Sequence, residues 1–160
     1  MSFCIVKDFK QFVKEVRFAV IKKAKVKIES TIENLDSAGL VDGEGEKTLS
    51  EADATYRFSD GEAVITYKEH SEGGEIFTRI TYIADGVSVK REGAIESNLL
   101  FIEGQTNISL YSIPPYKFDA EVYAKRVRVN LTPDGGEIDL LYNMKIGGAE
   151  KAARMKIWIL

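Results

Sequence analysis

The chain has 160 residues, of which 44% are hydrophobic and 29% are charged, a composition typical of one soluble domain with one core. Its net charge of -3 provides no general basic surface for a nucleic-acid backbone. Cys4 is the only cysteine, which excludes an intrachain disulfide and a cysteine-based zinc cluster. Charged residues interrupt any signal-peptide pattern at the start, and no run reaches the roughly 18 apolar residues of a membrane span. We therefore expect a cytoplasmic protein without a membrane segment.

Residues 3–20 are the only segment in which apolar side chains follow a helical period. The spacing is carried by Phe9, Phe12, Val13, Val16 and Val20. This pattern predicts an N-terminal helical extension over residues 1–23, followed by a main domain over residues 24–160. We expect the helix to cover one end of the main domain, because mixed charge on its polar face is atypical of a membrane-surface helix.

From Lys25 onward the apolar period changes to two, which is the period of a half-buried β-strand. About ten such segments follow one another, nearly all joined by short turns, and several of these turns contain Gly next to Asp or Gly. The predicted strands cover residues 25–32, 47–58, 62–69, 75–83, 87–92, 98–103, 105–112, 118–131, 138–146 and 151–160.

The segment 118–131 is too long for one flat strand, and its apolar face changes phase near Lys125-Arg126. A β-bulge or a bend at a sheet corner is the usual physical cause of such a change. Sequential hairpins build a meander, and a long meander leaves exposed edges unless it closes on itself. The sequence therefore predicts an all-β fold, a closed antiparallel up-and-down barrel of about eight to ten strands with an N-terminal helix.

A series of residues along the chain resembles the YwiB-like family of bacterial β-barrel proteins. The series comprises Arg91-Glu92-Gly93, Leu100-Phe101-Ile102-Glu103-Gly104-Gln105, Tyr111, Pro114, Phe118, Glu121-Val122, Val129-Asn130-Leu131, Gly135-Gly136-Glu137-Ile138 and Tyr142. The resemblance covers about residues 24–160. It implies a lipocalin-like barrel of the calycin type in a bacterial cytoplasm. It implies no reaction, because the function of that family is unknown.

Arg91 stands out because it shares a strand phase with Val87 and Val89, which points its side chain toward the apolar side. A buried guanidinium needs a carboxylate or several carbonyl groups, since unpaired burial of a charge is costly. Glu103 or Glu121 is a possible partner, and such a pair would fix the strand register. Alternatively, the planar guanidinium anchors an anionic ligand inside the barrel.

Downstream of Arg91, a polar and aromatic row shares one face of the strand at 105–112. It consists of Gln105, Asn107, Ser109 and Tyr111. The row either lines a cavity or faces water. The candidate ligand-binding residues are therefore Arg91, Gln105, Asn107, Tyr111 and Glu121.

His70 is the only histidine, and it lies in a polar turn. With one histidine and one cysteine, neither a catalytic triad nor a histidine-rich metal site can be assembled. We therefore expect no catalytic residue, no metal and no cofactor. The favoured function is a non-enzymatic binding module that holds a small amphiphilic or anionic ligand in the barrel interior.

The alternative function is binding of RNA or a protein partner through basic strand faces. Lys25 and Lys27 share one face of their strand, and Arg126 and Arg128 share one face of another. A basic stripe would form if the two strands were neighbours. Ordinary solvated faces explain the same clusters more simply.

Overall fold

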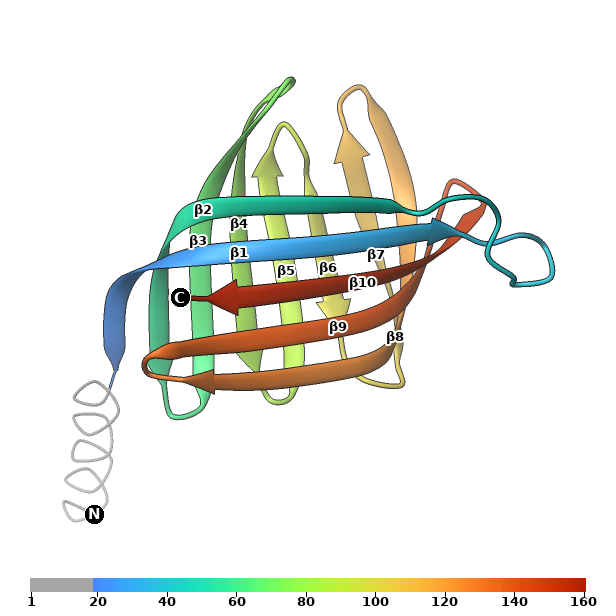
Figure 1. Cartoon of the computed structure of the whole chain (residues 1–160). Helices are drawn as coiled ribbons and strands as arrows, with labels where there is room; N and C mark the ends of the chain where they lie inside the picture. Colours follow the sequence, from blue (N-terminus) through green and yellow to red (C-terminus); the bar gives the residue numbers. More distant parts are fainter. Residues whose placement is uncertain (1–18) are drawn as a thin grey trace, which may run out of the picture.

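Ten antiparallel strands form one sheet that rolls into a nearly closed barrel in the computed structural model, which describes residues 19–160 (Figure 1). The strands are β1 (Val20–Asn34), β2 (Glu46–Ser59), β3 (Glu62–Ser71), β4 (Gly74–Ile83), β5 (Gly86–Gly93), β6 (Ser97–Phe101), β7 (Thr106–Ile113), β8 (Tyr116–Thr132), β9 (Gly135–Ile146) and β10 (Ala149–Ile159). The predicted number of strands and their order along the chain are confirmed.

The barrel closes where the first and last strands meet. The sheet order is β6-β5-β4-β3-β2-β1-β10-β9-β8-β7, and an unbroken register from Val26↔Ile159 to Asn34↔Lys151 joins β1 to β10. The two ends of the sheet are therefore β6 and β7. Two backbone hydrogen bonds between Glu96 and Ser112, of 2.8 and 2.7 Å, hold these ends together. The predicted meander barrel is thus nearly closed, with an incomplete seam between β6 and β7.

The predicted N-terminal helix is wrong for residues 19–23, the part of the prediction that the structure describes. Residues 19–160 contain no helix, and therefore none with the length and hydropathy that a membrane crossing requires. β1 begins at Val20, which lies opposite Phe58 of β2, so residues 20–23 belong to the barrel. Val20 and Ile21 are β-branched, and cross-strand pairing with β2 overrides the helical spacing. The remainder of the predicted helix, residues 1–18, lies outside the described residues.

The predicted irregularity in the long strand β8 is confirmed. The register between β8 and β9 shifts between Ala124 and Arg126. Side chains at Val122 and Ala124 face the interior before the shift, and Val127 is partly buried against the same core after it. Beyond the bulge, β8 turns from the back of the barrel and runs across its front beside β9 (Figure 1).

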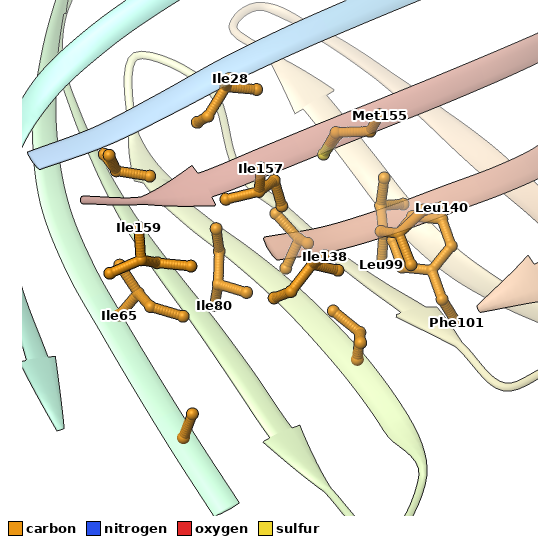
Figure 2. Close-up of a cluster of buried hydrophobic side chains, with 14 of the residues drawn as sticks. Ile28, Ile65, Ile80, Leu99, Phe101, Ile138, Leu140, Met155, Ile157 and Ile159 are labelled. Carbon is orange, nitrogen blue, oxygen red and sulfur yellow. The ribbon is translucent and has the colours of Figure 1, made fainter. Parts of the chain in front are cut away.

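The core lies between the strands that cross the front of Figure 1 and those that run behind them. Figure 2 shows Ile28, Ile138 and Ile157 from front strands extending toward Ile65 and Ile80 from back strands. Full burial of an apolar side chain of this size stabilises a fold by about 1.5–3 kcal/mol. The alternating pattern therefore yields a filled apolar centre.

Candidate functional site

A row of polar side chains interrupts the apolar lining near the end of the barrel at which β5 stops and β6 begins. The cross-strand register places Tyr67 opposite Thr78, Thr78 opposite Arg91, and Arg91 opposite Ser97. We call these four residues of β3 to β6 the Arg91 row. Tyr67, Thr78 and Ser97 are buried, with exposed fractions of 4%, 1% and 6%, and Arg91 is half-buried. The strand pairing therefore aligns a cation with hydroxyl groups on both sides of it.

Several polar atoms of this region have no partner, although buried polar groups are normally hydrogen-bonded. Of the seven buried side-chain atoms without a hydrogen bond in the described chain, five belong to β4 to β7. They are Thr78 Oγ1, Arg91 Nε, Ser97 Oγ, Asn107 Nδ2 and Ser109 Oγ. Thr78 lies beside the phenol of Tyr67, close enough to influence its pKa but without a hydrogen bond of normal geometry. Five unpartnered polar atoms therefore lie on four consecutive strands, β4 to β7.

The carboxylates expected to pair with Arg91 lie elsewhere. Glu103 Oε1 accepts a hydrogen bond of 3.1 Å from the backbone N–H of Val127, just beyond the bulge in β8. Glu121 is exposed on the outer side of β8, because the inward positions are Ala120 and Val122. Within residues 19–160, no ion pair joins Arg91 to a carboxylate. The structure therefore does not form the predicted register-fixing pair.

Two buried tyrosines are close enough to Arg91 for its charge to affect their pKa values. Burial raises the pKa of Tyr142 to about 12, and the nearby charge of Arg91 lowers it in part. Burial, and after it the negative charge of Glu69, raise the pKa of Tyr67, and the charge of Arg91 lowers it in part. Tyr111 is close enough to Tyr142 to influence the pKa of its phenol. Tyr67 and Tyr142 therefore remain neutral hydrogen-bond donors until strongly alkaline pH. Within residues 19–160 no ion pair joins Arg91 to a carboxylate, although the charge of Glu69 is close enough to Tyr67 to affect its pKa.

Three of the five predicted site residues lie on the inner face of the sheet. Arg91 faces the interior from β5, and Asn107 and Tyr111 face it from β7. Gln105 instead lies in the turn before β7, where its backbone N–H bonds to the carbonyl of Ile102 at 3.0 Å. Glu121 faces outward. These two residues are therefore not part of the interior site.

Sequence reasoning missed the members of the site on other strands. The signal for two of them was a polar residue in an apolar strand phase. Thr78 shares its phase with Ile76 and Ile80, and Ser97 shares its phase with Leu99 and Phe101.

Two openings of the surface lie near the site. One, of about 300 Å³, lies in the seam between β6 and β7 and is lined in part by Leu99, Asn107 and Ser109. The other is a wider cleft of about 940 Å³ where β3 separates from β2, and Tyr67 of the Arg91 row contributes to its lining. Tyr67 therefore borders one opening, and Leu99, two residues from Ser97, borders the other.

The basic residues of the outer surface do not form the stripe that binding of RNA would favour. β1 and β8 are separated by β10 and β9. Asp139 on β9 accepts hydrogen bonds from Arg154 at 2.8 and 3.1 Å and from Arg126 at 3.4 Å. The hydrogen bond from Arg154 is the main reason that the pKa of Asp139 is lowered. This face carries both charges, and Arg126 and Arg154 share Asp139 as an acidic partner.

Comparisons with other proteins agree with the barrel architecture. The "Uncharacterized beta-barrel protein YwiB" of Bacillus subtilis (strain 168) is 22% identical over 114 residues, which are 70% of this chain and 80% of that protein. The crystal structure of the ywiB protein from Bacillus subtilis matches with a TM-score of 0.72 at 20% identity, over 86% of this chain and 92% of that chain. At this identity the likeness shows the fold alone. The sequence pattern of the domain of unknown function DUF1934 matches residues 26–159, so the chain belongs to the DUF1934 family, as the YwiB-like resemblance predicted.

Proposed function

We propose that this protein binds a small anionic ligand at the end of the barrel interior, with Arg91 holding the acidic group of the ligand. One observation carries this proposal: Arg91 has a buried Nε without a hydrogen bond, and no carboxylate of residues 19–160 pairs with its charge. Burying a charge without a partner is costly, and such arrangements gather at functional sites. A ligand carboxylate or phosphate supplies the missing partner.

The neighbours of Arg91 suit an oxyanion. The neutral phenols of Tyr67 and Tyr142 and the hydroxyls of Thr78 and Ser97 are available to donate hydrogen bonds to a ligand, and none of these four groups carries a negative charge. Charge-assisted hydrogen bonds from a planar guanidinium are among the stronger polar contacts in proteins. A cation with several hydroxyl donors around it therefore selects a ligand with at least two acceptor oxygens.

A compact polar ligand fits this site better than a long acyl chain. Figure 2 shows the interior occupied by side chains such as Ile80, Phe101 and Leu140, whose exposed fractions are 0–1%. An acyl chain extending from Arg91 into the barrel would have to displace them. The cleft beside Tyr67 also carries charged groups, among them Lys68 and Glu69. The remainder of a polar ligand can extend in that direction.

Native mass spectrometry of the freshly purified protein, followed by a thermal-shift screen of small carboxylates and phosphates, tests this proposal. We expect a co-purified or selected anion whose Kd rises about 10- to 100-fold in Arg91→Met, because one charge-assisted contact contributes about 1.5–3 kcal/mol. Arg79→Met is the matched control, since Arg79 is exposed on the outer face of neighbouring β4. Unchanged affinity of the selected anion for Arg91→Met would reject the anchor, as would the absence of any binding anion.

A further inference from the structure

One edge of β2 is unpaired over its first half. β1 pairs with β2 along residues 46–58, whereas β3 pairs only with residues 54–59. Residues 46–53 therefore have a neighbouring strand on one side only. In Figure 1, β2 is the uppermost of the strands that cross the front, and its upper edge borders the cleft where β3 separates from it.

The hydrogen bonding of β1 shows which backbone groups occupy this edge. Lys25 exchanges two backbone hydrogen bonds with Leu160, of 3.0 and 2.8 Å, so its peptide groups point toward β10. Alternate residues of an antiparallel ladder bond to opposite sides, so the even-numbered residues of β1 bond to β2, where Val26 opposes Ala52. The odd-numbered residues of β2 therefore direct their N–H and C=O groups away from β1. They are Lys47, Leu49, Glu51 and Asp53.

The side chains at these positions are exposed and self-complementary. Leu49 is 58% exposed, with Lys47 two residues before it and Glu51 two residues after it. If two copies of this edge align antiparallel about a two-fold axis at Leu49, each Lys47 lies opposite Glu51 of the other copy. Leu49 then lies opposite its own copy. We propose that the protein forms a symmetric dimer by pairing β2 with β2 of a second copy in this register.

Charges on an edge strand commonly prevent such pairing, and their signs decide the outcome here. Like charges opposite one another repel, whereas a Lys–Glu pair across two strands is favourable. In the single chain, Lys47 lies 3.3 Å from Glu29 in a largely exposed ion pair, which contributes little to stability. In the register centred on Leu49, the charges on this edge therefore favour pairing with a second copy instead of preventing it.

The surroundings of the edge leave space for a second strand. The cleft of about 940 Å³ borders residues 50–55 of β2, and its wall includes the small side chains of Ser50 and Ala52. Each opposed pair in the proposed register exchanges two backbone hydrogen bonds, as in any antiparallel ladder. An edge contact of this length buries less area than the roughly 1,200 Å² of a stable interface, so the dimer is weak and depends on concentration.

Sedimentation velocity of the full chain, from about 10 μM to about 1 mM, tests the dimer. Lys47→Glu and Glu51→Lys each place like charges opposite one another, and we expect each to weaken association about tenfold or more. The double variant Lys47→Glu/Glu51→Lys restores opposite charges in the same register and is expected to restore the dimer. Lys156→Glu, on β10 of the same outer face, is the control that leaves association unchanged.

A second variant removes a backbone donor instead of a charge. Leu49→Pro eliminates one N–H that points toward the free edge and has no partner within the described chain, and proline is tolerated on such edges. We expect this variant to be monomeric while retaining the circular dichroism spectrum of the parent. A monomer at the highest concentration of the parent protein would overturn the proposal. A dimer that survives the single charge reversals, or that the double variant fails to restore, would also overturn it.

Discussion

Buried polar side chains are hydrogen-bonded at one end of the barrel interior and lack hydrogen-bond partners at the other. Near the turn between β8 and β9, the phenol of Tyr56 donates a hydrogen bond of 2.7 Å to the carbonyl of Thr132. At the Arg91 row, the hydroxyls of Thr78 and Ser97 and the Nε of Arg91 have no such partner. The first end shows that this fold can satisfy a polar group that it buries. At the Arg91 row, by contrast, the fold buries polar groups without supplying hydrogen-bond partners for them.

The apolar side chains between the two ends are expected to give the largest effect of a single substitution on stability. Phe101 has an exposed fraction of 0% and packs edge-on against Tyr142, with 4.8 Å between the ring centroids. Phe101→Ala removes this contact and leaves a cavity, so we expect the free energy of unfolding to fall by about 3–5 kcal/mol in urea denaturation. Leu110→Ala, at an exposed position on β7, is the control, with an expected change within about 0.5 kcal/mol. A loss below about 1 kcal/mol for Phe101→Ala would indicate a loosely filled interior beneath the Arg91 row.

Alkaline pH is expected to cause the next largest change in the free energy of unfolding. Burial raises the pKa of Tyr142 from its ordinary value of 10.0 to about 12. The unfolded chain therefore loses this proton first, and the stabilisation is complete below pH 10 and is lost as the pH rises toward 12. One pKa unit corresponds to about 1.4 kcal/mol, so the loss is on the order of 2 kcal/mol.

This contribution is measured by comparing urea denaturation of the parent protein and Tyr142→Phe between pH 9 and pH 12. We expect the free energy of unfolding to fall less steeply in the variant, because phenylalanine does not titrate. Equal slopes for the two proteins would show that the Tyr142 phenol is accessible to water at the open end of the barrel.

The tyrosines at the two ends are also expected to contribute differently to stability at neutral pH. Tyr56→Phe removes the hydrogen bond to Thr132 and leaves that carbonyl unpaired, so we expect the protein to lose about 1–2 kcal/mol in thermal or urea unfolding. Tyr142→Phe removes a hydroxyl that the structure places near Arg91 and Tyr111. We expect its effect on stability to stay within about 0.5 kcal/mol. Similar losses of stability for Tyr56→Phe and Tyr142→Phe would show that the chain supplies a hydrogen-bond partner to the tyrosine at each end.

Period-two alternation was sufficient to predict the strands, the bulge in β8 and the closure of β1 onto β10, because these features follow from local pattern and short turns. The pattern around residues 20–23 was ambiguous, since β-branched residues also fit a helical spacing there. Arg91 could be recognised because its strand phase is apolar. Thr78 and Ser97 carry the same signal, but that they lie opposite Arg91 could not be predicted, because it depends on register across the sheet.

The outer surface of β7 also escaped prediction, because the strand reverses the usual pattern. Asn107 and Ser109 face the interior, whereas Ile108 is 70% exposed and Leu110 is also exposed. A polar row toward the interior is ambiguous in sequence, since an ordinary edge strand places such a row toward water. Only the closed sheet identifies the inner face.

Little or no loss of stability is expected at the residue that matters most for the proposed function. Arg91→Met replaces a half-buried charge that has no partner in residues 19–160 with an apolar side chain of similar length. Such replacements are neutral or stabilising when no hydrogen-bonded carboxylate is left behind. We therefore expect the free energy of unfolding to change by less than about 1 kcal/mol or to rise, in the absence of added ligand.

Arg154→Met is the matched comparison for Arg91→Met. Arg154 donates hydrogen bonds of 2.8 and 3.1 Å to Asp139, and its removal is expected to destabilise the protein by up to about 1 kcal/mol, because the pair is partly exposed. A loss above about 2 kcal/mol for Arg91→Met would reveal a structural partner for the guanidinium and remove the argument for a ligand. Greater tolerance at Arg91 than at Arg154 would mean that the fold does not depend on this buried cation, which is the behaviour expected of a residue kept for binding.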